Sequence, residues 1–282
     1  MNILTFDIED WFHILDHKST KTEKDWRRYE SRMHLNMDRI FRLLEETQQK
    51  ATFFCLGWVA RQYPDIIQEI DARGYEIATH SDLHQLAYEQ NRAQFAEDLK
   101  RSIQSLEDVT GKKIRAYRAP GFSIKEQNKW ALELLLENGI EIDCSIFPAS
   151  RSHGGFQNFG FARPGWIEVG GMRLKEFPIN VAYLVGKPFI FSGGGYFRAF
   201  PLPVLNRLLT QSEYVMTYFH PRDFDPDQPV LPDLSLARRF KSYYGLGSSY
   251  DKLQHWLQRN HFSDLESSNQ AINWDAAPVY SL

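Results

Sequence analysis

Apolar side chains along the first 150 residues occur in short runs that alternate with longer amphipathic segments. Residues 2–7 and 51–56 are nearly continuous apolar runs, as expected for strands covered on both faces. Residues 91–109 instead place an apolar side chain every three to four positions and stop before Gly111, which predicts a helix. Further strands are expected in the segment that leads to His80 and at 114–118, 140–147, 166–169, 174–177 and 214–220. This alternation indicates a parallel α/β architecture, either a barrel or a doubly wound sheet.

Polar side chains stand where these predicted strands end. In both parallel architectures the active site lies at the carboxyl ends of the strands, so side chains at several strand ends are expected to meet. The sequence therefore predicts a metal or acid–base site at this edge. The residues concerned are Asp7, Glu9, Asp10, His80, Arg118, Asp143, Ser145 and His220.

Two groups among them are candidates for holding a cation. His80 and His84 are four residues apart, a spacing at which two imidazoles on one side of a helical turn can share a metal ion. Asp7, Glu9 and Asp10 lie within four positions and repel one another unless a cation lies among them. Either group also has an ordinary structural explanation, as solvated polar residues or as helix caps.

Composition narrows the function without naming it. The chain of 282 residues is 43% hydrophobic and 24% charged, with 33 basic and 36 acidic residues interspersed, so nucleic acid is an unexpected partner. No apolar run reaches the length of a membrane span, and the first seven residues lack the basic start of a signal peptide, so we expect a cytoplasmic protein. Cys55 and Cys144 lie in apolar runs and are expected to be buried thiols.

The second half of the chain shows a weaker pattern. Glu176 is interpreted as a surface charge, although it could lie near the site. The run Ser192-Gly-Gly-Gly195 could expose backbone amides to a ligand oxygen. A basic stretch at residues 238–241 precedes an amphipathic helix, and the residues after Ser263 are expected to pack loosely.

Five short motifs together resemble the polysaccharide deacetylase family, the carbohydrate esterases of family 4 with a NodB homology domain. The resemblance covers about residues 2–225 and implies a distorted, incomplete (β/α) barrel. It divides the chain into a catalytic domain, residues 1–225, and a C-terminal extension, residues 226–282, packed on the barrel. The motifs are Thr5-Phe-Asp7, His80-Ser-Asp-Leu-His84, Arg118-Ala-Pro-Gly-Phe122, Asp143-Cys-Ser145 and Tyr218-Phe-His220.

The resemblance also implies roles for individual residues. Asp7 would be the catalytic base, Arg118 would orient it, and His220 would be the general acid. His80 and His84 would bind a divalent metal together with one carboxylate. Pro120, Asp143 and Ser145 would form part of the substrate groove.

One departure leaves the third metal ligand open. The family's first motif has two adjacent aspartates, whereas here Asp7 is followed by Ile8, Glu9 and Asp10. Asp10 is favoured, because aspartate is the family's usual ligand and a local bend in the chain could turn its carboxylate towards the metal. Glu9 is the alternative ligand, because it would lie on the same strand face as Asp7.

The implied activity is metal-dependent removal of an acetyl group from the nitrogen of an amino sugar. The metal would be Zn2+, with Co2+, Ni2+ or Mn2+ as substitutes, and the substrate an N-acetylated saccharide or glycan precursor. The patterns Phe-Asp-x-Glu-Asp-Trp and His-Pro-x-x-Phe-Asp resemble a subgroup associated with bacterial exopolysaccharide or surface-glycan biosynthesis. Two alternatives remain: a hydrolase of a non-sugar amide or O-acetyl ester, and an inactive glycan-binding protein.

Overall fold

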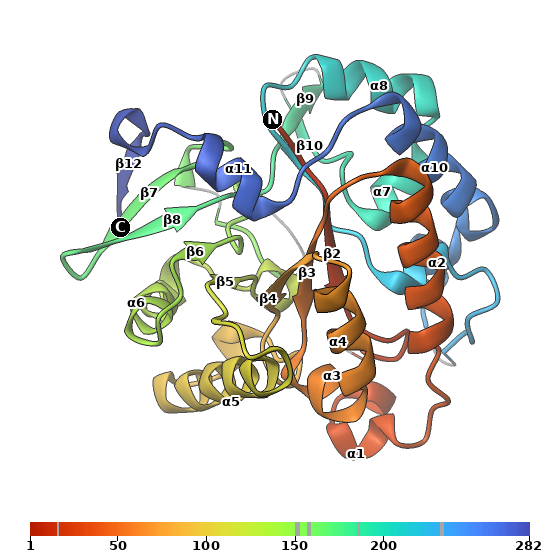
Figure 1. The fold of residues 1–282 in the computed structure, drawn as a ribbon, viewed down its shortest axis with the longest axis horizontal. Coiled ribbons are helices and arrows are strands. Elements are labelled where there is room, and N and C mark those ends of the chain that lie inside the picture. Colours follow the sequence, from red (N-terminus) through yellow and green to blue (C-terminus); the bar gives the residue numbers. More distant parts are fainter. Residues whose placement is uncertain (16, 150–152, 157–158, 185–186, 232–233) are drawn as a thin grey trace.

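A curved, mostly parallel sheet wrapped by helices forms the centre of the molecule (Figure 1). The computed structural model describes residues 1–15, 17–149, 153–156, 159–184, 187–231 and 234–282. The strands of the main sheet are β2 (Thr5–Ile8), β3 (Thr52–Cys55), β4 (Glu76–Thr79), β5 (Ala116–Tyr117), β6 (Ile142–Asp143), β7 (Gly165–Val169), β8 (Met172–Glu176) and β12 (Val279–Ser281). Their order is β12-β7-β8-β6-β5-β4-β3-β2, and only the β7–β8 pair is antiparallel. The predicted parallel α/β architecture is confirmed.

The sheet bends towards a barrel without closing by strand pairing. Next to β2, the short strands β1 (Asn2–Ile3) and β11 (Val215–Met216) pair in parallel. Single bridges continue this edge, from Phe6 to Phe219 and from Tyr218 to Gly193. Between β8 and residues 190–193 the described residues form no ladder, and the Asn180 side chain spans the seam. Its Oδ1 accepts hydrogen bonds from Ser192 Oγ and the Met216 amide, both at 3.0 Å. The result is an incomplete, distorted barrel.

Helices cover the outside of the strands, as Figure 1 shows for α2 to α6. Helix α5 illustrates why the sequence folds this way. The Asn91 side chain accepts the Gln94 amide N–H at its start, and Gly111 ends it in the left-handed region at φ 67°. The helices are α1 (Glu23–Trp26), α2 (Met33–Thr47), α3 (Gly57–Gln62), α4 (Pro64–Ala72), α5 (Arg92–Thr110), α6 (Trp130–Glu137), α7 (Gly194–Ala199), α8 (Leu202–Thr210), α9 (Leu236–Tyr243), α10 (Ser249–Arg259) and α11 (Leu265–Ala271). A hairpin of β9 (Ala182–Leu184) and β10 (Lys187–Phe189) lies apart from the main sheet.

The last twenty residues correct the expectation of a loosely packed tail. Strand β12 pairs in parallel with β7 and becomes an edge of the main sheet. Tyr280 is buried against Phe159, and Trp274 lies edge-on to Trp166 with ring centroids 5.0 Å apart. The chain end is therefore part of the folded unit.

Buried polar groups are concentrated inside the barrel. Glu176, expected on the surface, is fully buried at the end of β8, where its Oε1 accepts the Ile146 amide at 3.2 Å. Cys55 and Cys144 are buried free thiols, as predicted. No helix among the described residues is long and apolar enough to cross a lipid bilayer.

Candidate metal centre and active site

The carboxyl ends of the central strands bring the polar side chains together. Asp7 lies in β2 and Glu9 directly follows this strand. His80 follows β4 and Arg118 follows β5. Because these strands are parallel neighbours, their ends meet at one edge of the sheet. The side chains at several strand ends meet as expected, and their role in one site stays a prediction.

The two histidines reach this edge through an irregular turn and not through the helical turn that the sequence suggested. Ser81 and His84 have positive φ angles of 71° and 52°. The turn is held by the Asp98 carboxylate, which accepts the amides of Asp82 and Leu83 at 2.9 and 3.2 Å. The two histidines, four residues apart, are therefore brought together by a loop that Asp98 holds in place.

Glu9, His80 and His84 form the group that could hold a metal ion among the described residues. One ligand atom from each lies within 4.8 Å of the others, and all three side chains are buried. His80 Nδ1 donates to the Arg118 carbonyl at 2.8 Å, which leaves its Nε2 free to bind a metal. His84 Nε2 lies 2.8 Å from Glu9 Oε2. Two imidazoles and one carboxylate fit a catalytic zinc site, which uses three protein ligands.

The protonation states suit this use. Burial lowers the pKa of His80 to about 4, so its imidazole is neutral near pH 7. Burial acts to raise the pKa of the Glu9 carboxyl, but His84 and His220 outweigh burial and hold the pKa below its usual range. Neutral imidazoles and an ionised carboxylate are the forms that bind metal.

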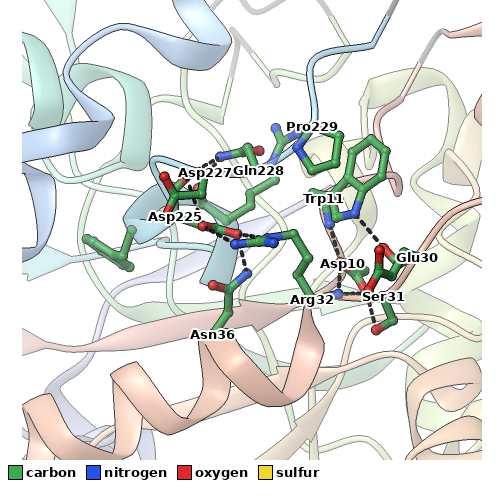
Figure 2. Close-up of polar contacts among 12 residues, drawn as sticks. Asp10, Trp11, Glu30, Ser31, Arg32, Asn36, Asp225, Asp227, Gln228 and Pro229 are labelled. Carbon is green, nitrogen blue, oxygen red and sulfur yellow. Dashed lines mark hydrogen bonds and ion pairs between the residues drawn. The ribbon is translucent and has the colours of Figure 1, made fainter.

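Asp10, which the sequence analysis favoured as the third ligand, lies elsewhere (Figure 2). Its carboxylate accepts hydrogen bonds from Ser31 Oγ at 2.5 Å, from the Trp11 amide at 2.8 Å and from the Arg32 amide at 3.1 Å. Burial raises the pKa of Asp10 to about 6. Side chains alternate along an extended chain, so Glu9 lies on the same face as Asp7 and Asp10 points to the opposite face. The preference for Asp10 over Glu9 is thus corrected by the geometry.

Figure 2 shows that Asp10 belongs to a structural brace at the start of α2. The backbone amide of Arg32 donates to Asp10, and the side chain of the same residue forms an ion pair with the buried Asp225 carboxylate. Asn36 and Arg39 also donate to Asp225, at 3.2 and 2.9 Å. The brace therefore connects two segments that lie far apart in the sequence, one near residue 10 and one near residue 225.

Asp7 is fixed by a buried arginine. Arg118 Nη1 donates to Asp7 Oδ1 at 2.6 Å and to Thr5 Oγ1 at 2.7 Å. The guanidinium carbon lies 4.0 Å from the centre of the Phe54 ring, and Arg118 has no exposed surface. Asp7 Oδ1 is thus bound by the Arg118 guanidinium, while Asp7 Oδ2 lies 3.9 Å from His220 Nε2.

His220 completes the site from the other side. Its Nε2 lies 3.3 Å from Glu9 Oε1, and its Nδ1 donates to Asp223 at 3.0 Å. Burial alone lowers the pKa of His220, but Glu9, Asp223 and Asp7 together raise it above the usual value. Asp223 was missed in the sequence, although its position three residues after His220, beyond Pro221, was a usable signal.

Three residues expected to contact substrate are buried, and their contact with substrate stays a prediction. Ser145 Oγ donates to Asp143 Oδ1 at 2.5 Å and accepts the Ala119 amide at 2.8 Å. Asp143, Ser145 and Pro120 lie inside the protein. Burial raises the pKa of Asp143 to about 6. Burial also raises the pKa of the neighbouring Glu176 well above its usual value. These side chains support the backbone that follows Arg118.

Comparison with known proteins agrees with this arrangement. Residues 13–140 match the family model described as polysaccharide deacetylase, and they include His80, His84 and Arg118. Residues 13–140 therefore form a domain of the polysaccharide deacetylase family. Residues 144–269 match a second model, a domain of unknown function named DUF3473.

Curated relatives are similar over part of their length. A peptidoglycan-N-acetylglucosamine deacetylase of Bacillus cereus is 23% identical over 103 residues, which are 36% of this chain and 38% of that protein. A peptidoglycan deacetylase of Helicobacter pylori is 25% identical over 112 residues, which are 40% of this chain and 37% of that protein. The chain therefore spans less than two fifths of the length of these relatives.

Solved structures share the fold. A candidate polysaccharide deacetylase from Mycobacterium smegmatis aligns with a TM-score of 0.67 at 18% identity, covering 100% of this chain and 92% of that one. A 4-alpha-glucanotransferase from Thermococcus litoralis aligns with a TM-score of 0.60 at 13% identity, covering 100% of this chain and 41% of that one. Since proteins with different chemistry share this architecture, the side chains of the site must carry the functional argument.

Proposed function

We propose that this protein is a metal-dependent hydrolase that removes the N-acetyl group of an amino sugar in a bacterial glycan or glycan precursor. The observation that carries the proposal is the convergence of three arrangements at one edge of the barrel. They are the Arg118-bound carboxylate of Asp7, the Glu9, His80 and His84 cluster, and the imidazole of His220. A general base, a metal site and a general acid are what amide hydrolysis requires.

Glu9, His80 and His84 would hold the ion. Zinc fits two imidazoles and a carboxylate, and Co2+, Ni2+ or Mn2+ could replace it. When bound, such an ion polarises a carbonyl and lowers the pKa of water from about 16 towards 7. The ionised state of Glu9 and the neutral state of His80 are set by the protein itself.

Asp7 and His220 would move the protons of the reaction. Asp7 accepts a proton from the attacking water at Oδ2, since Arg118 holds its other oxygen, Oδ1. His220 donates a proton from Nε2 to the departing sugar nitrogen, because its Nδ1 is engaged by Asp223. The amide and one water become an amine and acetate.

Acetate release from a substrate panel tests the proposal. We expect turnover of N-acetylated hexosamines or their oligomers, in polymeric or precursor form, and little turnover of simple acetyl esters or non-sugar acetamides. Turnover of esters or non-sugar amides alone would favour the first alternative activity. Saccharide binding without acetate release from any panel member would instead favour a glycan-binding protein.

Metal analysis of two neighbouring variants tests the ligand set. Glu9→Gln is expected to lower zinc affinity by about 10²-fold or more, because even the loss of a supporting group costs 10–100-fold. Asp10→Asn should keep the metal and instead lower the free energy of unfolding by about 1–3 kcal/mol, because it weakens hydrogen bonds to Ser31 and Arg32. Metal content is measured after dialysis and stability by denaturant unfolding. The reverse pattern would restore Asp10 as the ligand.

A further inference from the structure

A buried arginine from the region of unknown function lies behind the proposed general acid. Arg198 belongs to α7, and its side chain is 3% exposed. Its Nη1 donates to Asp223 Oδ1. The remaining contacts of the guanidinium go to main-chain carbonyls: Nη2 to Lys241 at 2.9 Å and Ser242 at 3.1 Å, and Nε to Tyr244 at 2.9 Å. Arg198 therefore ties one carboxylate to the C-terminal end of α9.

Asp223 presents its other oxygen to His220. Asp223 Oδ2 accepts both the backbone amide of His220, at 2.9 Å, and the ring Nδ1–H, at 3.0 Å. The two oxygens thus have separate partners, Arg198 on one side and His220 on the other. A buried carboxylate that lost its cation would face a desolvation cost of several kcal/mol and would shift or take up a proton.

The glycine run at residues 193–195 makes this arrangement possible. A Cβ on Gly194 would lie 2.1 Å from Asp223 Oδ2, and one on Gly193 would lie 1.8 Å from the Tyr218 ring. The start of α7 therefore approaches the carboxylate more closely than any other residue type allows. This approach to Asp223 and Tyr218 is sufficient to explain the run, and the ligand contact considered from the sequence stays a prediction.

We propose that Arg198 is a positioning residue for His220, which it orients by fixing the Asp223 carboxylate. This rests on the proposed deacetylase function. The ring of His220 is then held with Nε2 towards Glu9 and Asp7, at 3.3 and 3.9 Å. Since the same guanidinium holds residues 241, 242 and 244, the region after residue 225 takes part in placing the general acid. This assigns a role in the reaction to part of the DUF3473 region.

Steady-state kinetics of Arg198→Met and a double-mutant cycle test this role. Arg198→Met should lower kcat by about 10²-fold, the cost of a small misplacement of a reacting group, and change KM by less than about twofold. In an Asp223→Asn background the same substitution should cost almost nothing further, because Arg198 acts through Asp223. Additive losses would overturn the proposal, since they would show that Arg198 acts independently of Asp223.

Two further variants separate positioning from general support of α7. Lys252 Nζ donates to the carbonyls of Arg198 and Phe200, at 2.8 and 3.1 Å, and does not contact Asp223. Lys252→Met should therefore leave kcat within about threefold of wild type, and an equal loss in this variant would overturn the proposal. Arg198→Lys should recover part of kcat, because a point charge replaces only one contact of the planar guanidinium.

Nitrogen-15 histidine NMR reads the imidazole without any turnover. In the wild-type protein the Nδ1–H of His220 should give a slowly exchanging signal, which should be lost or broadened in Arg198→Met and retained in Lys252→Met. If Arg198→Met does not fold, Arg198→Gln, which also removes the charge, is measured in the same way. An unchanged signal would overturn the positioning role even if deacetylation is found. A lost signal without deacetylation in wild type would instead overturn the proposed function alone.

Discussion

Removal of the metal is expected to lower acetate release by at least about 10²–10³-fold, the range seen when a stabilising group at a developing oxyanion is lost. The reason is that Glu9, His80 and His84 form a buried cluster whose ligand atoms lie within 4.8 Å. Adding zinc to the dialysed protein should restore the rate. Acetate release and metal content are measured on the same samples.

Variants at two histidines control this experiment. His80→Ala should be as inactive as the metal-free protein and should not recover with zinc. His34→Ala is a matched control, because His34 is an exposed histidine paired with Asp65 on the surface. Full turnover by a protein shown to be free of metal would contradict the metal-dependent mechanism.

Asp7→Asn is expected to lower kcat by about 10²–10⁴-fold, the usual contribution of a general base. The amide can still accept the hydrogen bond from Arg118, but it cannot take a proton from water. Zinc content should stay at the wild-type level, because Asp7 is not one of the three clustered ligands. Turnover and metal analysis of the purified variant check both statements.

The exposed Asp38 on α2 supplies the control for the Asp7 experiment. Asp38→Asn makes the same chemical change at an exposed position outside the candidate site and should leave kcat unchanged. A loss of less than about tenfold in Asp7→Asn would argue against a role as base. Loss of zinc in that variant would place Asp7 among the ligands.

Local sequence patterns were sufficient to predict most of the fold. The apolar run 51–56 and the periodic segment 91–109 became β3 and α5 with nearly the expected bounds. Strand β12 was not predicted, because three residues at the chain end give little local signal and their pairing with β7 is set by tertiary structure. The barrel seam at Asn180 likewise depends on side-chain contacts that no periodicity shows.

Part of the candidate site was also predictable, and the rest was not. Asp7, His80, His84, Arg118 and His220 do meet at one edge of the sheet. The choice between Glu9 and Asp10 depended on where β2 ends, which a sequence pattern locates only to within a few residues. Arg198 could not be found, because its link to Asp223 spans 25 residues and depends on the close approach of a glycine.

The brace between residues 10 and 225 affects how inactive relatives should be recognised. Asp10 and Asp225 hold Ser31, Arg32 and α2 in place, so a descendant that had lost catalysis would still be less stable without them. Glu9 belongs instead to the cluster that could hold a metal, and its substitution would act on metal binding. A search for degenerate copies should therefore compare the position of Glu9, since Asp10 and Asp225 stabilise the fold whether or not the site is active.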